Sequence, residues 1–175
     1  MDVYAYFEEQ IPKVNRVLDA VIPAADTAPA QLHAAMRHIL FPGGKRLRPV
    51  LAMAAAEAVG SPSESALPLA AAVELVHTYS LVHDDLPCMD DDAERRGVPA
   101  VHVAFGEAVA VPAGDALLAA AFEVLAKGSR DLEPERVVAA SLEVSRAAGS
   151  PALVGGQAED LVFAASATNA ARSEE

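Results

Sequence analysis

Proline and glycine residues divide this chain into segments of helical length, and their spacing restricts the fold more than any other feature. Helix signals dominate these segments, and no alternating strand pattern bounded by hairpin turns is present. We therefore predict an all-α protein, folded as a helical bundle in one domain over residues 1–175. Helices are expected over about residues 3–22, 30–40, 49–60, 64–85, 105–127, 134–148 and 151–167, with kinks at Pro12 and Pro112.

The composition is apolar and acidic. Hydrophobic residues make up 53% of the chain, and the abundant alanine among them favours helices and close contact between helices. The formal net charge of -12 disfavours non-specific binding to nucleic acids. The single cysteine, Cys88, cannot form an internal disulfide, no signal peptide is recognisable, and no apolar run approaches the ~20 residues that span a bilayer. We expect a cytoplasmic protein without stable membrane association and without a nucleic-acid partner.

Five aspartates lie within nine positions, at Asp84, Asp85, Asp90, Asp91 and Asp92. The first two stand near the carboxyl end of an apolar helix, where the helix dipole is negative and disfavours carboxylates. A bound divalent cation would reverse this cost and the repulsion between the carboxylates, and oxygen-rich ligand sets suit Mg²⁺. A solvated acidic turn is the alternative interpretation of such a run.

His77 precedes Asp84 by seven residues, which is two helical turns, so both side chains point the same way. Ser80 and Leu81 fill the helix face between them. This face suits a ligand with a charged head group at one end and an apolar tail below it. A purely structural histidine is the alternative.

Two basic clusters flank the aspartates. The segment from Gly43 to Pro49 joins a glycine turn to a helix start, where free N–H groups favour an anion, and Lys45 and Arg48 share a face. The pair Arg95 and Arg96 follows the aspartates directly, and arginine binds phosphate oxygens in a fork. A basic surface turn and simple charge balancing are the alternatives. Together the three clusters suggest two anionic substrates, one of them held through a metal.

Three motifs together resemble the trans-isoprenyl diphosphate synthases, also called polyprenyl synthetases, and most closely the bacterial farnesyl diphosphate synthases. They are GGKRLRP at residues 43–49, HTYSLVHDDLPCMDDD at 77–92 and RRG at 95–97. The similarity extends to Gly106, to residues 113–115, to residues 155–157 and to Asp160, and covers about residues 31–160 in unbroken order. The resemblance implies an isoprenoid-synthase-type helical bundle.

The activity that this resemblance implies is a Mg²⁺-dependent prenyl transfer, with Mn²⁺ able to replace Mg²⁺. Isopentenyl diphosphate would be condensed with dimethylallyl or geranyl diphosphate, giving a short-chain product that we expect to be farnesyl diphosphate. The resemblance assigns isopentenyl diphosphate binding to Lys45, Arg48, His77 and Arg96, contact with the allylic diphosphate to Arg95, and metal ligation to Asp84 and Asp90. It further implies that Gln157 and Asp160 line the site, that Asp85 and Asp91 act through water, with Asp85, Asp91 and Asp160 as further candidate metal ligands, and that Asp115 and His102 have buried structural roles.

Product length in this family is implied to depend on the residue five positions before the first motif aspartate. In this sequence that residue is Tyr79, followed by Ser80. A bulky ring beneath the growing tail would stop elongation at a short product. The alternative is an ordinary core aromatic.

The sequence also departs from the family. No second aspartate-rich motif follows Asp115, and residues 161–175 are expected to depart from the family pattern. We therefore expect the amino-terminal portion of a homodimeric enzyme, truncated at its carboxyl end and with little prenyl transfer activity alone. The alternative is a non-catalytic short subunit that binds and modulates a full-length synthase. A class I terpene cyclase is disfavoured, because one diphosphate gives no reason for Lys45, Arg48 and Arg96.

Overall fold

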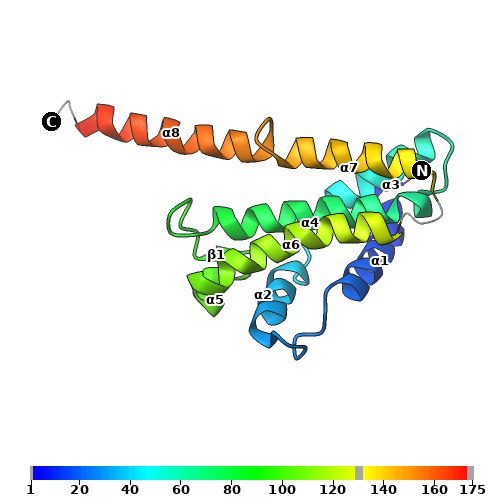
Figure 1. Ribbon diagram of the computed structural model, residues 1–175, viewed down its shortest axis with the longest axis horizontal. Coiled ribbons are helices and arrows are strands. Elements are labelled where there is room, and N and C mark those ends of the chain that lie inside the picture. Colours follow the sequence, from blue (N-terminus) through cyan, green and yellow to red (C-terminus); the bar gives the residue numbers. More distant parts are fainter. Residues whose placement is uncertain (1, 129–131, 173–175) are drawn as a thin grey trace. The chain divides into compact units, whose positions relative to one another are not determined.

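The computed structural model describes residues 2–128 and 132–172, with side chains described as far as Phe163 (Figure 1). Its described residues are predominantly helical, which confirms the all-α fold class. The elements, in chain order, are α1 (Val3–Val21), α2 (Ala30–Leu40), α3 (Leu47–Ala58), the 3-10 turn η1 (Ser63–Ala66), α4 (Leu67–Asp84), β1 (Glu94–Arg95), β2 (Val98–Pro99), α5 (Val101–Phe105), α6 (Glu107–Gly128), α7 (Pro134–Ala148) and α8 (Leu153–Arg172).

The chain forms two compact units, residues 1–137 and 138–175. Helices α1 to α6 belong to the first unit, and α8 belongs to the second. The single domain expected over residues 1–175 stays a prediction, because a compact unit is not by itself an independently folding domain.

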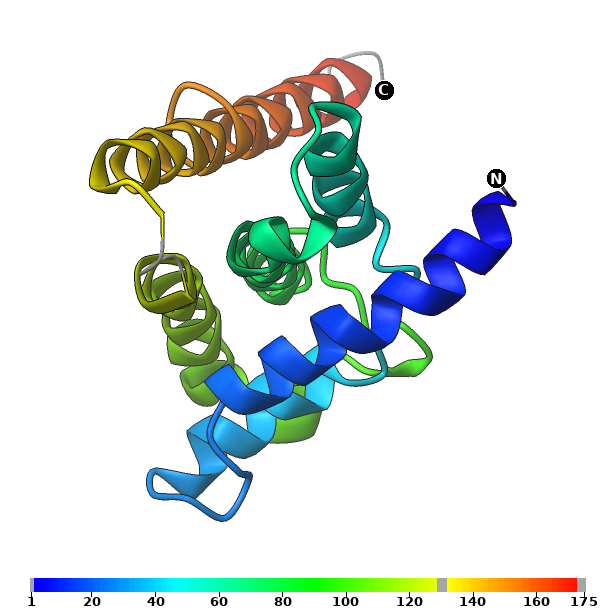
Figure 2. The same ribbon diagram turned by 90° about the vertical axis from the view of Figure 1, so that its right-hand side faces the viewer.

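Helix α4 is the centre of the first unit. Figure 2 looks along this helix, which contacts α1, α2, α3 and α6. The successive alanines Ala70, Ala71 and Ala72 are all fully buried, because small side chains let neighbouring helices approach from several sides. A helix that is buried all round has no polar face, so any charged residue on it must find a partner inside the protein.

The expected helix boundaries are close to those observed, with two exceptions. The helix expected over residues 64–85 begins as the turn η1 and becomes α-helical only at Leu67. The helix expected over residues 105–127 is interrupted by Gly106, whose φ of 84° ends α5 and precedes α6. Glycine adopts this backbone conformation without the steric cost that a Cβ imposes.

A short hairpin between the aspartates and α5 was not expected from the sequence. Glu94 pairs with Pro99 and Arg95 with Val98 in an antiparallel arrangement. The two connecting residues, Arg96 and Gly97, have φ values of 57° and 77°, as in the tight turns that suit hairpins. Strands of two residues are too short to show an alternating pattern, so the sequence analysis missed them.

Two apolar segments are long enough to span a bilayer by length and composition, Ser63–Asp84 and Glu107–Gly128. The expectation that no stretch reaches this length is therefore wrong by this measure. Buried residues make up 56% and 44% of an apolar 18-residue window in each segment, a pattern that the core helices of a bundle also produce. The absence of membrane association stays a prediction.

The close contact between α4 and α6 can be tested at Gly114. A Cβ added there would lie 2.2 Å from Nε2 of His83, whereas a Cβ at Gly156 in α8 would meet nothing within 4 Å. The added methyl group forces the His83 ring to move, so we expect the free energy of unfolding of Gly114→Ala to lie about 1–3 kcal/mol below that of Gly156→Ala, where alanine gains the same helix propensity without a clash. Gly156→Ala should leave the free energy of unfolding unchanged or raise it, because alanine favours helices. Urea denaturation measures both, and equal behaviour of the two variants would contradict this packing.

Candidate active site

Three described residues other than glycine have a left-handed backbone, Arg46, Asp91 and Arg96, with φ values of 48°, 54° and 57°. Each lies in a different one of the three sequence motifs. A non-glycine residue in this conformation costs of order 1–3 kcal/mol and persists only where its surroundings hold it. Such strain is typical of functional sites, so the same motifs are singled out by backbone geometry and by sequence.

The side chain that holds two of these residues is Glu74, in the middle of α4. Its Oε1 accepts a hydrogen bond from Nη1 of Arg46 at 2.7 Å and another from Nη2 of Arg96 at 3.0 Å. The side chains of Arg46 and Glu74 are only 1% and 2% exposed. One buried carboxylate thereby fixes both basic loops to the same helix.

Arg46 also links three helices. Its Nε donates to Oδ1 of Asn15 in α1 at 3.0 Å, and its Nη2 donates to the carbonyl of Leu40 at the end of α2 at 2.7 Å. Arg46 is therefore a buried structural residue, whereas its neighbours Lys45 and Arg48 are exposed.

The guanidinium of Arg96 lies beneath the glycine turn. Its Nη1 donates to the carbonyl of Ile39 at 3.1 Å, and a Cβ added at Gly44 would lie 3.3 Å from its Nε. Gly44 itself has a φ of 75°. Glycine is needed here both for the backbone conformation and for the close approach of Arg96.

His77 lies among these basic residues and is half-buried. Its pKa is lowered to about 4, first by burial and then by the charges of Arg48, Arg96, Arg95 and Arg46. The imidazole is therefore neutral at pH 7. The fold brings together His77, Arg48 and Arg96, three of the four residues expected to bind one diphosphate, and Lys45 lies exposed in the same loop as Arg48.

Residues 84–92, which contain the five aspartates, form a loop that is closed by main-chain hydrogen bonds; we call it the aspartate loop. The N–H of Asp90 donates to the carbonyl of Asp84 at 2.8 Å, and the N–H of Asp91 donates to the carbonyl of Leu86 at 3.2 Å. This closure brings Asp84, the last residue of α4, next to Asp90, whose side chain is exposed. These are the two carboxylates that the sequence analysis assigns to the metal.

Asp85 has a different role from its neighbour. It is fully buried, and its Oδ1 accepts hydrogen bonds from Nε and Nη2 of Arg95 at 2.9 and 2.6 Å. Asp92 pairs with the same guanidinium. Burial raises the pKa of Asp85, while the charge of Arg95 opposes that shift. Asp85 therefore positions Arg95, which is 28% exposed and faces solvent in part.

The adjacent arginines are held apart by two carboxylates, one within α4 and one directly after its last residue. Arg95 pairs with Asp85 and Arg96 with Glu74. These partners are eleven residues apart, which is about 16 Å along a helix axis. The two guanidinium groups therefore serve different ends of the site.

A divalent metal fits the Asp84–Asp90 pair by its chemistry. No group of three or more metal-binding side chains occurs among the residues that the structure describes. Mg²⁺ usually takes only one or two carboxylates and completes its coordination with water and substrate phosphates. Asp84 and Asp90, which are joined through their main chains, supply two carboxylates of this kind.

Tyr79 and Ser80, assigned to product length, are both buried in α4. The Tyr79 ring stands edge-on to His83, with the ring centres 5.6 Å apart. Its pKa is raised by burial and then by the charge of Asp84. The hydroxyl of Ser80 donates to the carbonyl of His77 at 3.0 Å, so its hydrogen bond is made within α4. Tyr79 thus lies in the core near Asp84.

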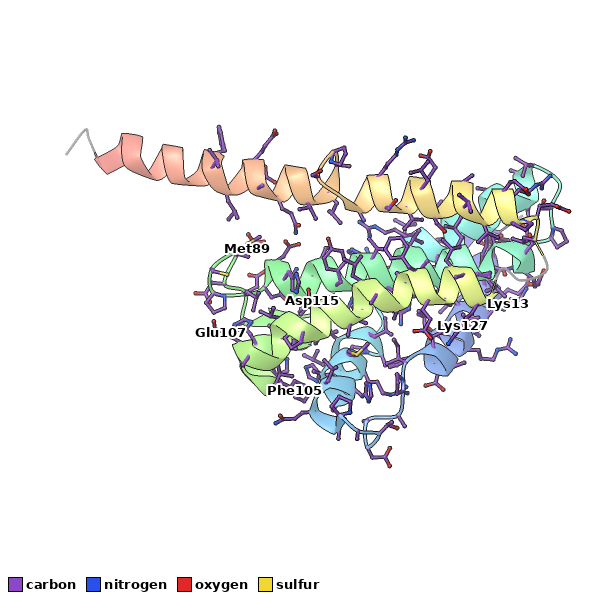
Figure 3. The ribbon with its side chains drawn as sticks, in the orientation of Figure 1. Lys13, Met89, Phe105, Glu107, Asp115 and Lys127 are labelled. Atoms are coloured by element: carbon purple, nitrogen blue, oxygen red, sulfur yellow. The ribbon has the colours of Figure 1, made fainter. Side chains whose placement is uncertain are left out.

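The prediction of a buried role for Asp115 is wrong. Its side chain is 68% exposed and lies 4.0 Å from Nε2 of His83, at the same end of the bundle as Met89 of the aspartate loop (Figure 3). The preceding Ala113 and Gly114 take the buried positions of this turn. His102 is half-buried, and its Nδ1 is enclosed, in agreement with a structural role.

The remaining predicted residues, Gln157 and Asp160, lie on α8 in the second unit. Gln157 is partly buried and Asp160 is exposed. Their assignment to the site stays a prediction. Sequence reasoning overlooked Glu74 and Arg46, although a lone glutamate in the apolar segment LPLAAAVELV was a usable signal.

Comparisons with known proteins give a consistent result. The chain matches the polyprenyl synthetase family over residues 29–175, past Asp160, where we expected the resemblance to end. It is 49% identical over 162 residues to the chloroplastic heterodimeric geranylgeranyl pyrophosphate synthase large subunit 1 of Arabidopsis thaliana. It is 47% identical over 156 residues to the chloroplastic geranylgeranyl pyrophosphate synthase of Capsicum annuum. These alignments cover 91% and 89% of this chain and 43% and 42% of the relatives.

Solved structures agree with this likeness and confirm the isoprenoid-synthase-type bundle. An FPP/GFPP synthase from Zymomonas mobilis superimposes with a TM-score of 0.85 at 39% identity, over 91% of this chain and 57% of that one. A geranylgeranyl pyrophosphate synthetase from the archaeon Geoglobus acetivorans gives 0.80 at 38% identity, over 91% and 49%. The chain thus spans roughly half the length of the proteins that it matches.

The lowered pKa of His77 has a testable consequence. Between about pH 6.5 and 4 the unfolded chain binds a proton at this residue that the folded chain does not, so stability falls as the pH falls through this window. The variant His77→Asn should show a weaker dependence of the unfolding free energy on pH, measured by urea denaturation. The His77 ring signals in NMR should also titrate near pH 4, and a midpoint near 6.5 would contradict the burial described.

Proposed function

The chain belongs to the polyprenyl synthetase family, and from this premise we propose that it carries the diphosphate-binding part of a prenyltransferase. The reaction condenses isopentenyl diphosphate with dimethylallyl or geranyl diphosphate to form a short-chain isoprenyl diphosphate. The supporting observation is that helix α4 carries both His77, which lies among the charges of Arg48 and Arg96, and Asp84, the first residue of the proposed metal pair. The two lie seven residues apart, which is about 10 Å along the axis and leaves room for two diphosphates.

Each group has a separate task in this proposal. Lys45, Arg48, His77 and Arg96 bind isopentenyl diphosphate, and Arg95 binds the allylic diphosphate beside Asp84 and Asp90. Mg²⁺ at these carboxylates, or Mn²⁺ in its place, supplies Lewis-acid stabilisation of the leaving diphosphate. Arg95, fixed by Asp85, adds positive charge that is oriented before the reaction starts.

The chemistry needs no protein nucleophile. The allylic C–O bond breaks and its electron pair leaves with the diphosphate. The double bond of isopentenyl diphosphate attacks the allylic cation and forms the new C–C bond. The proton lost in restoring a double bond goes to the released diphosphate.

The proposed product is farnesyl diphosphate, because the Tyr79 ring stands near Asp84, where an elongating tail would pass. The relatives are named for geranylgeranyl and geranylfarnesyl products, and the Zymomonas mobilis protein for FPP and GFPP. Tyr79 is therefore the residue on which the shorter product depends. We further propose a cytoplasmic location and a homodimer for the active enzyme.

A second candidate is a non-catalytic subunit that modulates a full-length synthase. It is favoured by two relatives, which are named as large subunits of heterodimeric geranylgeranyl pyrophosphate synthases. Incubation with labelled isopentenyl diphosphate, geranyl diphosphate and Mg²⁺ separates the two. Product formed by the protein alone supports the enzyme, whereas an inactive protein that changes the rate or the product length of an added full-length synthase supports the subunit. Failure to bind either diphosphate would exclude the proposed function.

The metal assignment predicts a specific loss in Asp84→Asn. This variant should weaken Mg²⁺-dependent binding of a non-ionising thio analogue of geranyl diphosphate by at least about tenfold, because one charged metal ligand is lost. Asp115→Asn, at an exposed aspartate near the same end of the bundle, is the matched control and should bind as the wild type does. Calorimetric titration with and without Mg²⁺ gives the comparison, and equal binding by both variants would contradict the assignment.

The product-length assignment predicts that Tyr79→Ala lengthens the product of the active enzyme. Removing the buried ring opens space in the core beside α4, at a cost of about 3–5 kcal/mol in stability. Tyr79→Phe, which keeps the ring, should leave the product unchanged. Chromatography of the dephosphorylated products measures chain length, and an unchanged distribution in Tyr79→Ala would remove Tyr79 from this role.

A further inference from the structure

We propose that Glu74 is a positioning residue of the diphosphate site, which sets the conformation of both basic loops without touching the ligand. The inference rests on the proposed function for the identity of the anion. It concerns a residue to which neither the motifs nor the family resemblance gives a role.

The Glu74 carboxylate connects two loops that are distant in the sequence. Glu74 Oε1 accepts hydrogen bonds from both Arg46 and Arg96, which lie fifty residues apart in the chain. The side chains are 1%, 2% and 10% exposed for Arg46, Glu74 and Arg96. The carboxylate is enclosed by the two arginines and is remote from solvent. It is therefore the point at which the loop before α3 and the hairpin turn are joined to α4.

Both arginines that pair with Glu74 have a strained backbone. Arg46 and Arg96 are two of the three described non-glycine residues with a positive φ, and both are tied to Glu74. A residue with a left-handed backbone returns to ordinary φ and ψ angles unless an interaction of its side chain or main chain holds it. Release of Arg46 would turn the backbone between Lys45 and Arg48, and release of Arg96 would move its guanidinium away from Gly44.

Glu74 also offsets the repulsion between the arginines. Burial lowers the pKa of Arg96, and Glu74 opposes that shift. The charges of Arg46 and Arg48 lower the pKa of Arg96 further, because like charges that lie close together repel. Without Glu74 the like charges would separate, and the site would lose the spacing that a diphosphate requires.

A positioning role for Glu74 predicts that its removal weakens anion binding, whereas its charge alone predicts that removal strengthens anion binding. Removal of a carboxylate near an anion site makes the site more positive, and a purely electrostatic role for Glu74 would give tighter anion binding. A positioning role gives weaker binding, because the cations lose their arrangement. The sign of the change therefore decides between the two.

The experiment measures the affinity of the protein for inorganic diphosphate without metal, by calorimetry, in Glu74→Gln and Glu74→Asp. The first variant removes the charge and keeps the shape, and the second keeps the charge and shortens the reach. We expect both to bind at least tenfold more weakly than the wild type. Asp19→Asn removes one negative charge at the exposed pair with Arg37 and should not weaken binding.

A double variant keeps the test decisive if Glu74→Gln fails to fold. Arg46→Met with Glu74→Met replaces a buried pair by apolar side chains of similar size, which proteins commonly tolerate. It should retain the helical circular dichroism spectrum and still lose diphosphate affinity. NMR supplies a second readout, since the guanidinium signals of Arg96 should be resolved in the wild type and averaged in the Glu74 variants.

The outcomes separate the two proposals. Folded Glu74 variants that bind diphosphate as tightly as the wild type, or more tightly, would overturn the positioning role and leave the proposed function intact. A wild-type protein that binds no diphosphate would overturn both. Weaker binding in the variants together with unchanged binding in Asp19→Asn supports the inference.

Discussion

The organisation of the first unit depends on one ion pair in its interior, between Glu74 and Arg46. Breaking a buried pair by removing one partner costs about 3–5 kcal/mol, a large share of the 5–15 kcal/mol that usually separates folded from unfolded chains. Arg46 also bonds to Asn15 and to the Leu40 carbonyl, so the pair ties α1 and α2 to α4 as well. The interaction that stabilises the bundle is thereby the one that places its basic loops.

Much of the helical layout followed from proline and glycine, because those residues limit the backbone wherever they stand. The metal and diphosphate assignments came from the resemblance of the motifs to the family, and they stay predictions. The roles of Glu74 and Arg46 came from neither source, because they arise from a pairing between distant loops that no local pattern encodes. Asp115 was misjudged for a related reason. Its helix turns by about 100° per residue, so a position next to buried Ala113 and Gly114 can face solvent.

The site uses its two kinds of charge in different ways. Buried carboxylates at Glu74 and Asp85 hold arginines in place, while Asp90, Lys45 and Arg48 are exposed to solvent. An acidic chain with a net charge of -12 can in this way present a locally cationic surface to a diphosphate. The arginines need no rearrangement to meet the anion, and preorganised charge of this kind is what electrostatic catalysis requires.

The closure of the aspartate loop through main-chain atoms has a consequence for how this segment can change over evolution. Because the Asp90 amide bonds to the Asp84 carbonyl, the spacing of the two carboxylates is set below the tip of the loop. Pro87 and Cys88 at the tip are exposed. Neither residue takes part in the hydrogen bond between Asp90 and Asp84 that closes the loop. Substitutions at the tip should therefore leave the main-chain geometry at Asp84 and Asp90 unchanged.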